Sequence, residues 1–184
     1  MYSASQRGHL AIVKVLLEAG SNVNQARTSN GGSPLYIASE NGNVALVKVL
    51  IEAGGNVNQA TTDNEATPLF MASFNGHVDI VRLLLQHPNI DTNKKTNRGD
   101  SPLYIASKKG NVTLVKGVKK GGGNVNQRLL DGSVRDLSNN RKAKPTIRKQ
   151  NGHVDIVGLL LRHPNIDANE GYRDTITQFC RTRE

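Results

Sequence analysis

Five histidines are the side chains of this sequence best suited to metal binding or proton transfer. His9, His77 and His153 each follow a glycine. His87 and His163 each precede Pro-Asn-Ile-Asp. Side chains that recur together with their surroundings are usually structural, and no His-Glu-x-x-His or paired Cys-x-x-Cys spacing occurs to favour zinc. We therefore predict no metal site and expect the first set to hydrogen-bond backbone groups in a turn.

Three further motifs could carry chemistry, but each has a simpler interpretation. Gly121-Gly122-Gly123 lacks the Gly-x-x-x-x-Gly-Lys-Ser/Thr order that cradles phosphates, and it stands where glycines end a helix. Asn111-Val112-Thr113 fits a glycosylation sequon, although such tripeptides are common by chance. Cys180 is the only cysteine, and no histidine lies near it in sequence to favour a nucleophile. Because no acid pair, triad or cofactor motif emerges, we predict a chain that is not an enzyme and binds no cofactor.

The net charge of +9 comes from one segment rather than from the whole chain. Residues 108–150 hold twelve Lys and Arg with two Asp, a net charge of +10, whereas the remainder has a net charge of −1. Such a segment attracts phosphates regardless of sequence. No aromatic residue lies between Lys108 and Gln150, however, so the base stacking that holds single strands is missing. Nucleic-acid or anionic-surface binding through 108–150 is therefore an alternative function and not the favoured one.

The composition is typical of an intracellular folded protein. No stretch approaches the roughly 20 apolar residues that a membrane-spanning helix needs. A single cysteine indicates a reducing compartment, so we expect a cytoplasmic location. Because tryptophan is absent and aromatic residues make up 4% of the chain, the core should be aliphatic.

The elements that position these side chains come from an internal repeat. Glycines recur every 34 residues, at Gly8, Gly42, Gly76 and Gly110. Residues 75–93 and 151–169 differ at only three of nineteen positions, which indicates duplication. A repeat of this length is typical of solenoids, in which a unit buries its apolar face only by stacking on its neighbours.

Residues 33–65 predict how one unit folds. Ser33 caps a helix whose first position is Pro34, and Asn41-Gly42 ends that helix. A second helix follows, with apolar residues at helical spacing at Val44, Leu46, Val47, Leu50 and Ile51. The turn-rich stretch from Thr61 to Glu65 then leads to the next unit as an extended finger.

Three motifs resemble the ankyrin repeat closely: Ser-Pro-Leu-Tyr-Ile-Ala-Ser, Asn-Gly-His-Val-Asp-Ile-Val-Arg-Leu-Leu-Leu and Gly-Gly-Asn-Val-Asn. The resemblance covers residues 1–127 and, again, about 151–169. It implies an all-α fold, an ankyrin-type solenoid of stacked antiparallel helix pairs with extended β-turn fingers. Two departures stand out. Tyr36, Phe70 and Tyr104 replace the usual histidine, and the unit has one residue more than the usual ~33, placed in the finger.

We expect the repeat array over residues 1–127, with units at about 1–30, 31–64, 65–98 and 99–127. A basic irregular insert over 128–150, a partial ankyrin unit over 151–170 and an unpatterned tail over 171–184 follow. Met1 aligns with Leu35, so the chain is expected to start inside a first helix, as a fragment would. Gly117 and Lys119 predict a weakened fourth unit, and another helix is expected over 152–163. The insert has three interpretations: a binding segment, a solvated loop, or the product of a reading-frame slip.

The resemblance implies that the fingers and first helices form a concave face that binds partners. We therefore predict a non-catalytic, monomeric protein–protein interaction module. Its predicted contact residues are Ser29, Asn30, Glu40, Asn41, Asp63, Asn64, Phe74, Asn75, Asn97, Arg98, Asp100, Lys108 and Lys109. Phe74 stands where neighbouring units have Glu40 and Lys108, and is either a binding anchor or a lone exposed aromatic. A decayed repeat fragment without selected function is the remaining alternative.

Overall fold

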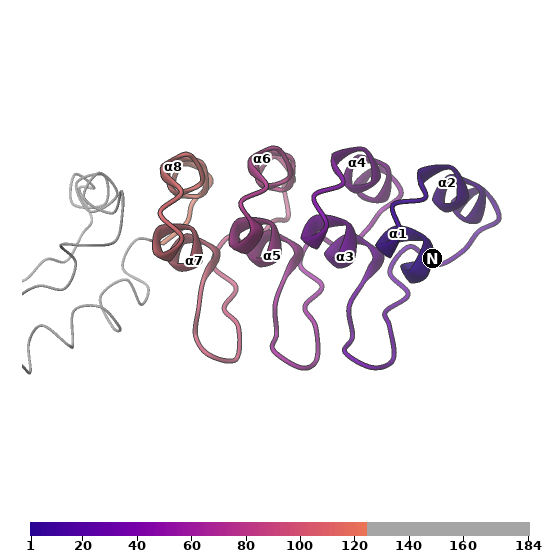
Figure 1. Cartoon of the computed structure of the whole chain (residues 1–184), viewed down its shortest axis with the longest axis horizontal. Coiled ribbons are helices and arrows are strands. Elements are labelled where there is room, and N and C mark those ends of the chain that lie inside the picture. Colours follow the sequence, from indigo (N-terminus) through magenta and orange to yellow (C-terminus); the bar gives the residue numbers. More distant parts are fainter. Residues whose placement is uncertain (125–184) are drawn as a thin grey trace, which may run out of the picture.

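The computed structural model describes residues 1–124, which fold into helices arranged in two rows (Figure 1). The first helices of the units form one row: α1 (Tyr2–Gln6), α3 (Pro34–Glu40), α5 (Pro68–Asn75) and α7 (Pro102–Lys108). The second helices form the other: α2 (Leu10–Glu18), α4 (Val44–Glu52), α6 (Val78–Leu85) and α8 (Val112–Lys120). Finger loops extend from the first row, away from the second. The described residues contain no strand, and the predicted all-α solenoid is confirmed. The predicted insert, the partial unit with its helix over 152–163, and the tail lie outside the described residues.

The first helices begin where the hydroxyl caps predict. Ser33 Oγ accepts a hydrogen bond from Tyr36 N at 3.0 Å, and a proline occupies the first turn. Thr67 and Ser101 cap α5 and α7 in the same way. Each cap satisfies one of the N–H groups that a helix start leaves without an intrahelical partner, a contribution of about 1 kcal/mol.

The fingers close by a backbone hydrogen bond across each loop, and they are not all the same length. Arg27 N donates to Gly32 O and Thr61 N donates to Ala66 O, whereas Thr96 N donates to Asp100 O. The third loop is therefore one residue shorter than the first two. The prediction that the additional residue lies in the finger is wrong for unit 65–98, where that residue lies between α6 and Asn93.

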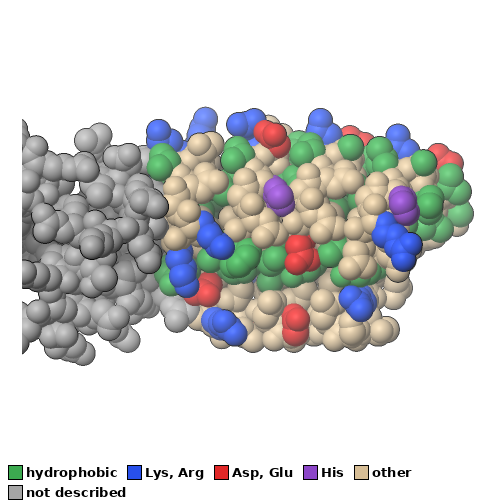
Figure 2. All heavy atoms as spheres, viewed as in Figure 1, with side chains coloured by type: hydrophobic (Ala, Val, Ile, Leu, Met, Phe, Trp, Pro, Cys, Tyr) green, Lys and Arg blue, Asp and Glu red, His purple; other side chains and the backbone are tan. Residues whose placement is uncertain are grey.

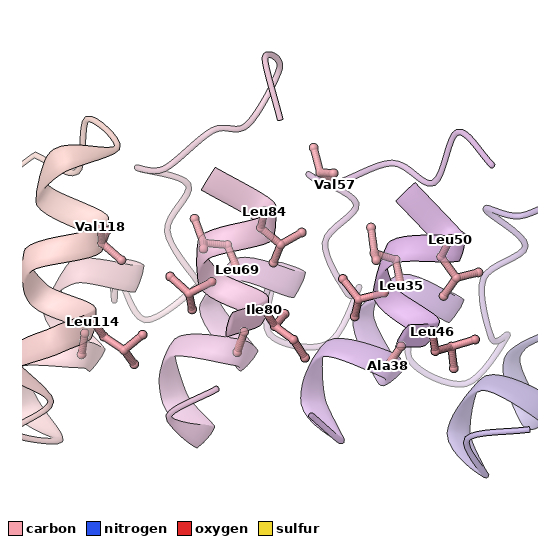
Figure 3. Close-up of a cluster of buried hydrophobic side chains, with 14 of the residues drawn as sticks. Leu35, Ala38, Leu46, Leu50, Val57, Leu69, Ile80, Leu84, Leu114 and Val118 are labelled. Atoms are coloured by element: carbon pink, nitrogen blue, oxygen red, sulfur yellow. The ribbon is translucent and has the colours of Figure 1, made fainter. Parts of the chain in front are cut away.

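The core between the two rows is aliphatic, as the composition predicts. Leu35, Leu46, Leu50, Leu69, Ile80 and Leu84 are among its fully buried side chains. Figure 3 shows these side chains pointing toward one another from both rows of helices. Fully burying a leucine or isoleucine contributes about 1.5–3 kcal/mol, so this continuous core supplies most of the stability. The core runs from Val13 of α2 to Val118 of α8 without interruption between units.

Asparagine side chains also join each unit to the next. Asn58 Nδ2 donates to Asn89 O at 2.6 Å, and Asn58 Oδ1 accepts from Asp91 N at 2.8 Å. Asn24 and Asn93 make the same pair of bonds, one unit earlier and one unit later. Each amide thereby satisfies one carbonyl and one N–H of the neighbouring unit, at about 1 kcal/mol per bond.

The second helix of the fourth unit forms in spite of its glycine. α8 spans nine residues, as α4 does, although Gly117 interrupts its apolar pattern. Asn111 Oδ1 accepts a hydrogen bond from Leu114 N at 3.1 Å, and the side chains of Leu114, Val115 and Val118 are buried. Capping and burial therefore outweigh the roughly 1 kcal/mol that a helical glycine costs relative to alanine. No helix in residues 1–124 is both long enough and apolar enough to cross a bilayer.

Candidate functional site

Aromatic side chains at one repeat position form a band along the row of first helices. They lie 34 residues apart, at Tyr2, Tyr36, Phe70 and Tyr104. Tyr36 and Phe70 belong to a buried cluster, and Tyr2 and Met71 pack against it. Figure 2 shows a band of hydrophobic side chains crossing this side of the array above the fingers, with charged side chains along it. The positions that carry histidine in the resembled family are thus filled here by packed rings.

Phe74, near the end of α5, extends this band to the surface. Its side chain is 39% exposed. The ring stacks on Phe70 with 6.4 Å between centroids and 28° between planes, and Lys109 Nζ lies 4.1 Å from the Phe74 centroid. A cation at this distance from an exposed ring stabilises by roughly 0.5–1 kcal/mol. The two contacts hold the exposed ring in place.

The charge along this face changes from acidic near α3 to basic near α7. Partial burial raises the pKa of the Glu40 carboxyl above its ordinary value. Burial first, and then the charges of Glu40 and Asp63, raise the pKa of the Tyr36 hydroxyl to about 12. At the other end, Lys108 Nζ lies 5.9 Å from the Tyr104 ring centroid, close to Lys109 in sequence.

Five of the predicted contact residues are asparagines whose side chains hold the array together. Asn41 Nδ2 donates to Gln6 O at 2.8 Å, and Asn75 Nδ2 donates to Glu40 O at 2.9 Å, each reaching the preceding unit. Asn97 Nδ2 donates to Asp63 O at 3.0 Å and joins neighbouring fingers. Asn30 and Asn64 each accept a hydrogen bond from a backbone N–H within their own finger. Three of these five amides therefore join neighbouring units, and the other two stabilise their own fingers.

The other predicted residues lie on the fingers or at the ends of the first helices. On the fingers are Ser29, Asp63, Arg98 and Asp100, and at the helix ends are Glu40, Phe74, Lys108 and Lys109. α5, which carries Phe74, lies between α3, which carries Glu40, and α7, at whose end Lys108 and Lys109 lie.

The ankyrin-repeat family model, which comprises three copies of the repeat, matches residues 1–96 and 53–128. The chain belongs to the ankyrin-repeat family. No curated protein matches it. Ankyrin repeats are generally protein–protein interaction modules and are typically not enzymes, so a binding surface rather than a catalytic centre is the feature to explain.

His77 and His87 of this ankyrin-repeat chain hydrogen-bond backbone groups. His77 Nε2 lies 3.0 Å from Glu40 O, so it bonds the end of the preceding unit's first helix and not its own turn. His87 Nδ1 accepts from Asn89 N at 3.2 Å. Within residues 1–124, no three His, Cys, Asp or Glu side chains gather closely enough to hold a metal ion. His153, His163 and Cys180 lie outside this range.

Sequence reasoning missed part of the surface. Tyr2 and Arg27 were not predicted as contacts, yet Arg27 Cζ lies 5.6 Å from the Tyr2 ring centroid and continues the aromatic and basic pattern into the first unit. The 34-residue recurrence of aromatics could have revealed this band. The structural use of Asn41 and Asn75 could also have been inferred, because both units carry the same residue there, whereas Glu40 and Phe74 differ.

Proposed function

We propose that this chain binds a partner protein on its concave face, the surface of the fingers and first helices, with Phe74 as the central contact. The observation that carries the proposal is the fixed, exposed ring. It is 39% exposed, stacked on Phe70, and lies 4.1 Å from Lys109 Nζ. Well-packed aromatics near the centre of an interface supply much of the binding energy.

The charges around Phe74 define the partner's chemistry. Lys109 lies at the ring, and Arg98 belongs to the neighbouring finger. Glu40 occupies the equivalent position one unit earlier. A partner segment that places an apolar side chain on Phe74 and a carboxylate near Lys109 would complement this face, because opposite charges favour the correct register.

The test is affinity capture from a nuclease-treated lysate with the intact chain, Phe74→Ala and Val15→Ala. Val15 lies on α2, far from this face, and its side chain is 62% exposed, so Val15→Ala controls for the loss of an exposed apolar group. A captured protein is then purified and its Kd for each variant is measured. We expect Phe74→Ala to weaken binding about 30-fold, which corresponds to about 2 kcal/mol. Val15→Ala should bind as the intact chain does.

Two outcomes would count against the concave face. Equal losses in Phe74→Ala and Val15→Ala would place the contact elsewhere. Capture that occurs only in a parallel lysate without nuclease treatment and ignores both substitutions would favour the second candidate, which is anionic binding through 108–150. That candidate is supported by α8, which carries Lys116, Lys119 and Lys120 and no acidic residue.

A further inference from the structure

Successive second helices meet along a seam, and one repeat position of the later helix lies on it. This position is Val49 in α4, Leu83 in α6 and Gly117 in α8, at intervals of 34 residues. Leu83 packs against the core cluster from this position. At Gly117 a Cβ atom would meet no other heavy atom within 4 Å, so the α6/α8 seam is open where the earlier one carries a leucine.

The open seam forms a groove on the side of the array opposite the fingers. It has a volume of about 450 Å³. We call it the outer groove and define it by its lining residues Val78, Val81 and Leu85 of α6, Thr113 and Gly117 of α8, and Gly121 directly after α8. Sites that hold ligands or anchoring side chains generally have volumes of roughly 300–1,000 Å³ and are mainly apolar. The outer groove therefore has the size and the lining to receive a large apolar side chain.

The rim of the outer groove is basic. Arg82 and Lys120 contribute to its lining, one from each helix. Asp79 lies 3.2 Å from Arg82 and forms an exposed ion pair with it, which screens that charge only in part. α8 contains no acid that could offset Lys120. An occupant with carboxylates beside an apolar group would match both the floor and the rim of the groove.

We propose that the outer groove is a second protein-docking site, which takes a partner segment with a large apolar side chain next to acidic residues. The apolar side chain fills the space that Gly117 leaves, and the carboxylates lie against Lys120 and Arg82. Grooves between helices commonly receive one face of a partner helix in this way. The site lies on the second helices and is independent of the proposed concave face.

The experiment selects from a random peptide library displayed on phage, using the intact chain as the target. Gly117→Leu fills the groove with the side chain that α6 has at this position, and it strengthens helix propensity, so lost binding would not reflect unfolding. Lys120→Glu keeps the groove and reverses its rim charge. Val49→Leu, at the same position of the α2/α4 seam, is the matched control.

We expect selected peptides that combine Leu, Ile, Met or Phe with neighbouring Asp or Glu. Their affinity should fall at least about tenfold for Gly117→Leu and for Lys120→Glu, and should be unchanged for Val49→Leu and Phe74→Ala. The proposal is overturned if selected peptides bind Gly117→Leu as tightly as the intact chain. It is also overturned if the selection enriches no peptides that combine large apolar residues with acidic ones. Binding of dodecanoate alone, a fatty acid tested in parallel, would likewise overturn it.

Discussion

Glu65 occupies a backbone conformation that favours glycine. Its φ is +58°, whereas the corresponding finger positions hold Gly31 with φ +68° and Gly99 with φ +79°. In the left-handed region the Cβ of an L-residue crowds the following carbonyl oxygen, which costs roughly 1–2 kcal/mol. The second finger carries this cost, and the other two do not.

Replacing Glu65 with glycine should therefore stabilise the array. Relief of the left-handed strain favours the variant, and the greater freedom of glycine in the unfolded chain offsets roughly 0.5–1 kcal/mol of that gain. The expected net increase in the free energy of unfolding is about 0.5–1 kcal/mol. The Glu65 side chain is exposed, so its removal leaves no cavity.

Urea denaturation followed by circular dichroism at the helical band measures this difference. Glu65→Ala is the matched control, because it removes the same carboxylate but keeps the Cβ atom that causes the strain. The Gly variant should exceed both the intact chain and the Ala variant in stability. If the Gly and Ala variants unfold at the same urea concentration, backbone strain at Glu65 is not the cause, and the reasoning is refuted.

Two further predictions concern the bonds between units and the buried phenol. Asn58→Ala should lower the free energy of unfolding by about 1–2 kcal/mol, because Asn89 O and Asp91 N lose their hydrogen-bond partner. Asn58→Asp keeps the acceptor for Asp91 N and should recover part of this loss. Urea titrations of both variants measure the difference. Burial raises the pKa of the Tyr36 hydroxyl in the folded state to about 12, above the value of about 10 for an exposed tyrosine. The stabilising contribution of this group is therefore complete below about pH 10 and is lost as the pH rises toward about 12. Tyr36→Phe should remove that part of the slope in unfolding free energy measured across this range, and an unchanged slope would contradict the assignment.

Much of the fold could be predicted from the sequence, because the same pattern recurs in each repeat unit and supports the same inference each time. The hydroxyl residues before Pro34, Pro68 and Pro102 predicted three helix starts, and Ser33, Thr67 and Ser101 all form the expected caps. The aliphatic core followed equally directly from the composition, which has no tryptophan and few aromatic residues. The shorter third finger was not predicted, because a residue gained before Asn93 and one lost from the loop cancel in the 34-residue spacing.

The candidate binding surface was harder to predict from the sequence than the fold, because an exposed side chain can already be hydrogen-bonded within the chain. Asn41 and Asn75 are exposed as predicted, yet their amides bond carbonyl groups of the preceding unit. The exposure expected of a position does not distinguish an amide that faces solvent from one that reaches across 35 residues, and the sequence signal was instead the recurrence of asparagine at this repeat position. The stacked Phe74 ring and the Lys109 ammonium likewise come from different units, so their contact depends on how the units stack.

The contacts of the array have a mechanical consequence. Every substantial helix–helix contact joins helices of the same unit or of adjacent units, and none of these contacts connects α1 or α2 with α7 or α8. Small rotations at successive seams would therefore add up along the described stack and change its curvature, because no substantial contact between distant units opposes them. The distance between finger tips would change with that curvature, and at the α6/α8 seam a Cβ on Gly117 would meet no other heavy atom within 4 Å, so this seam offers little steric resistance to the change.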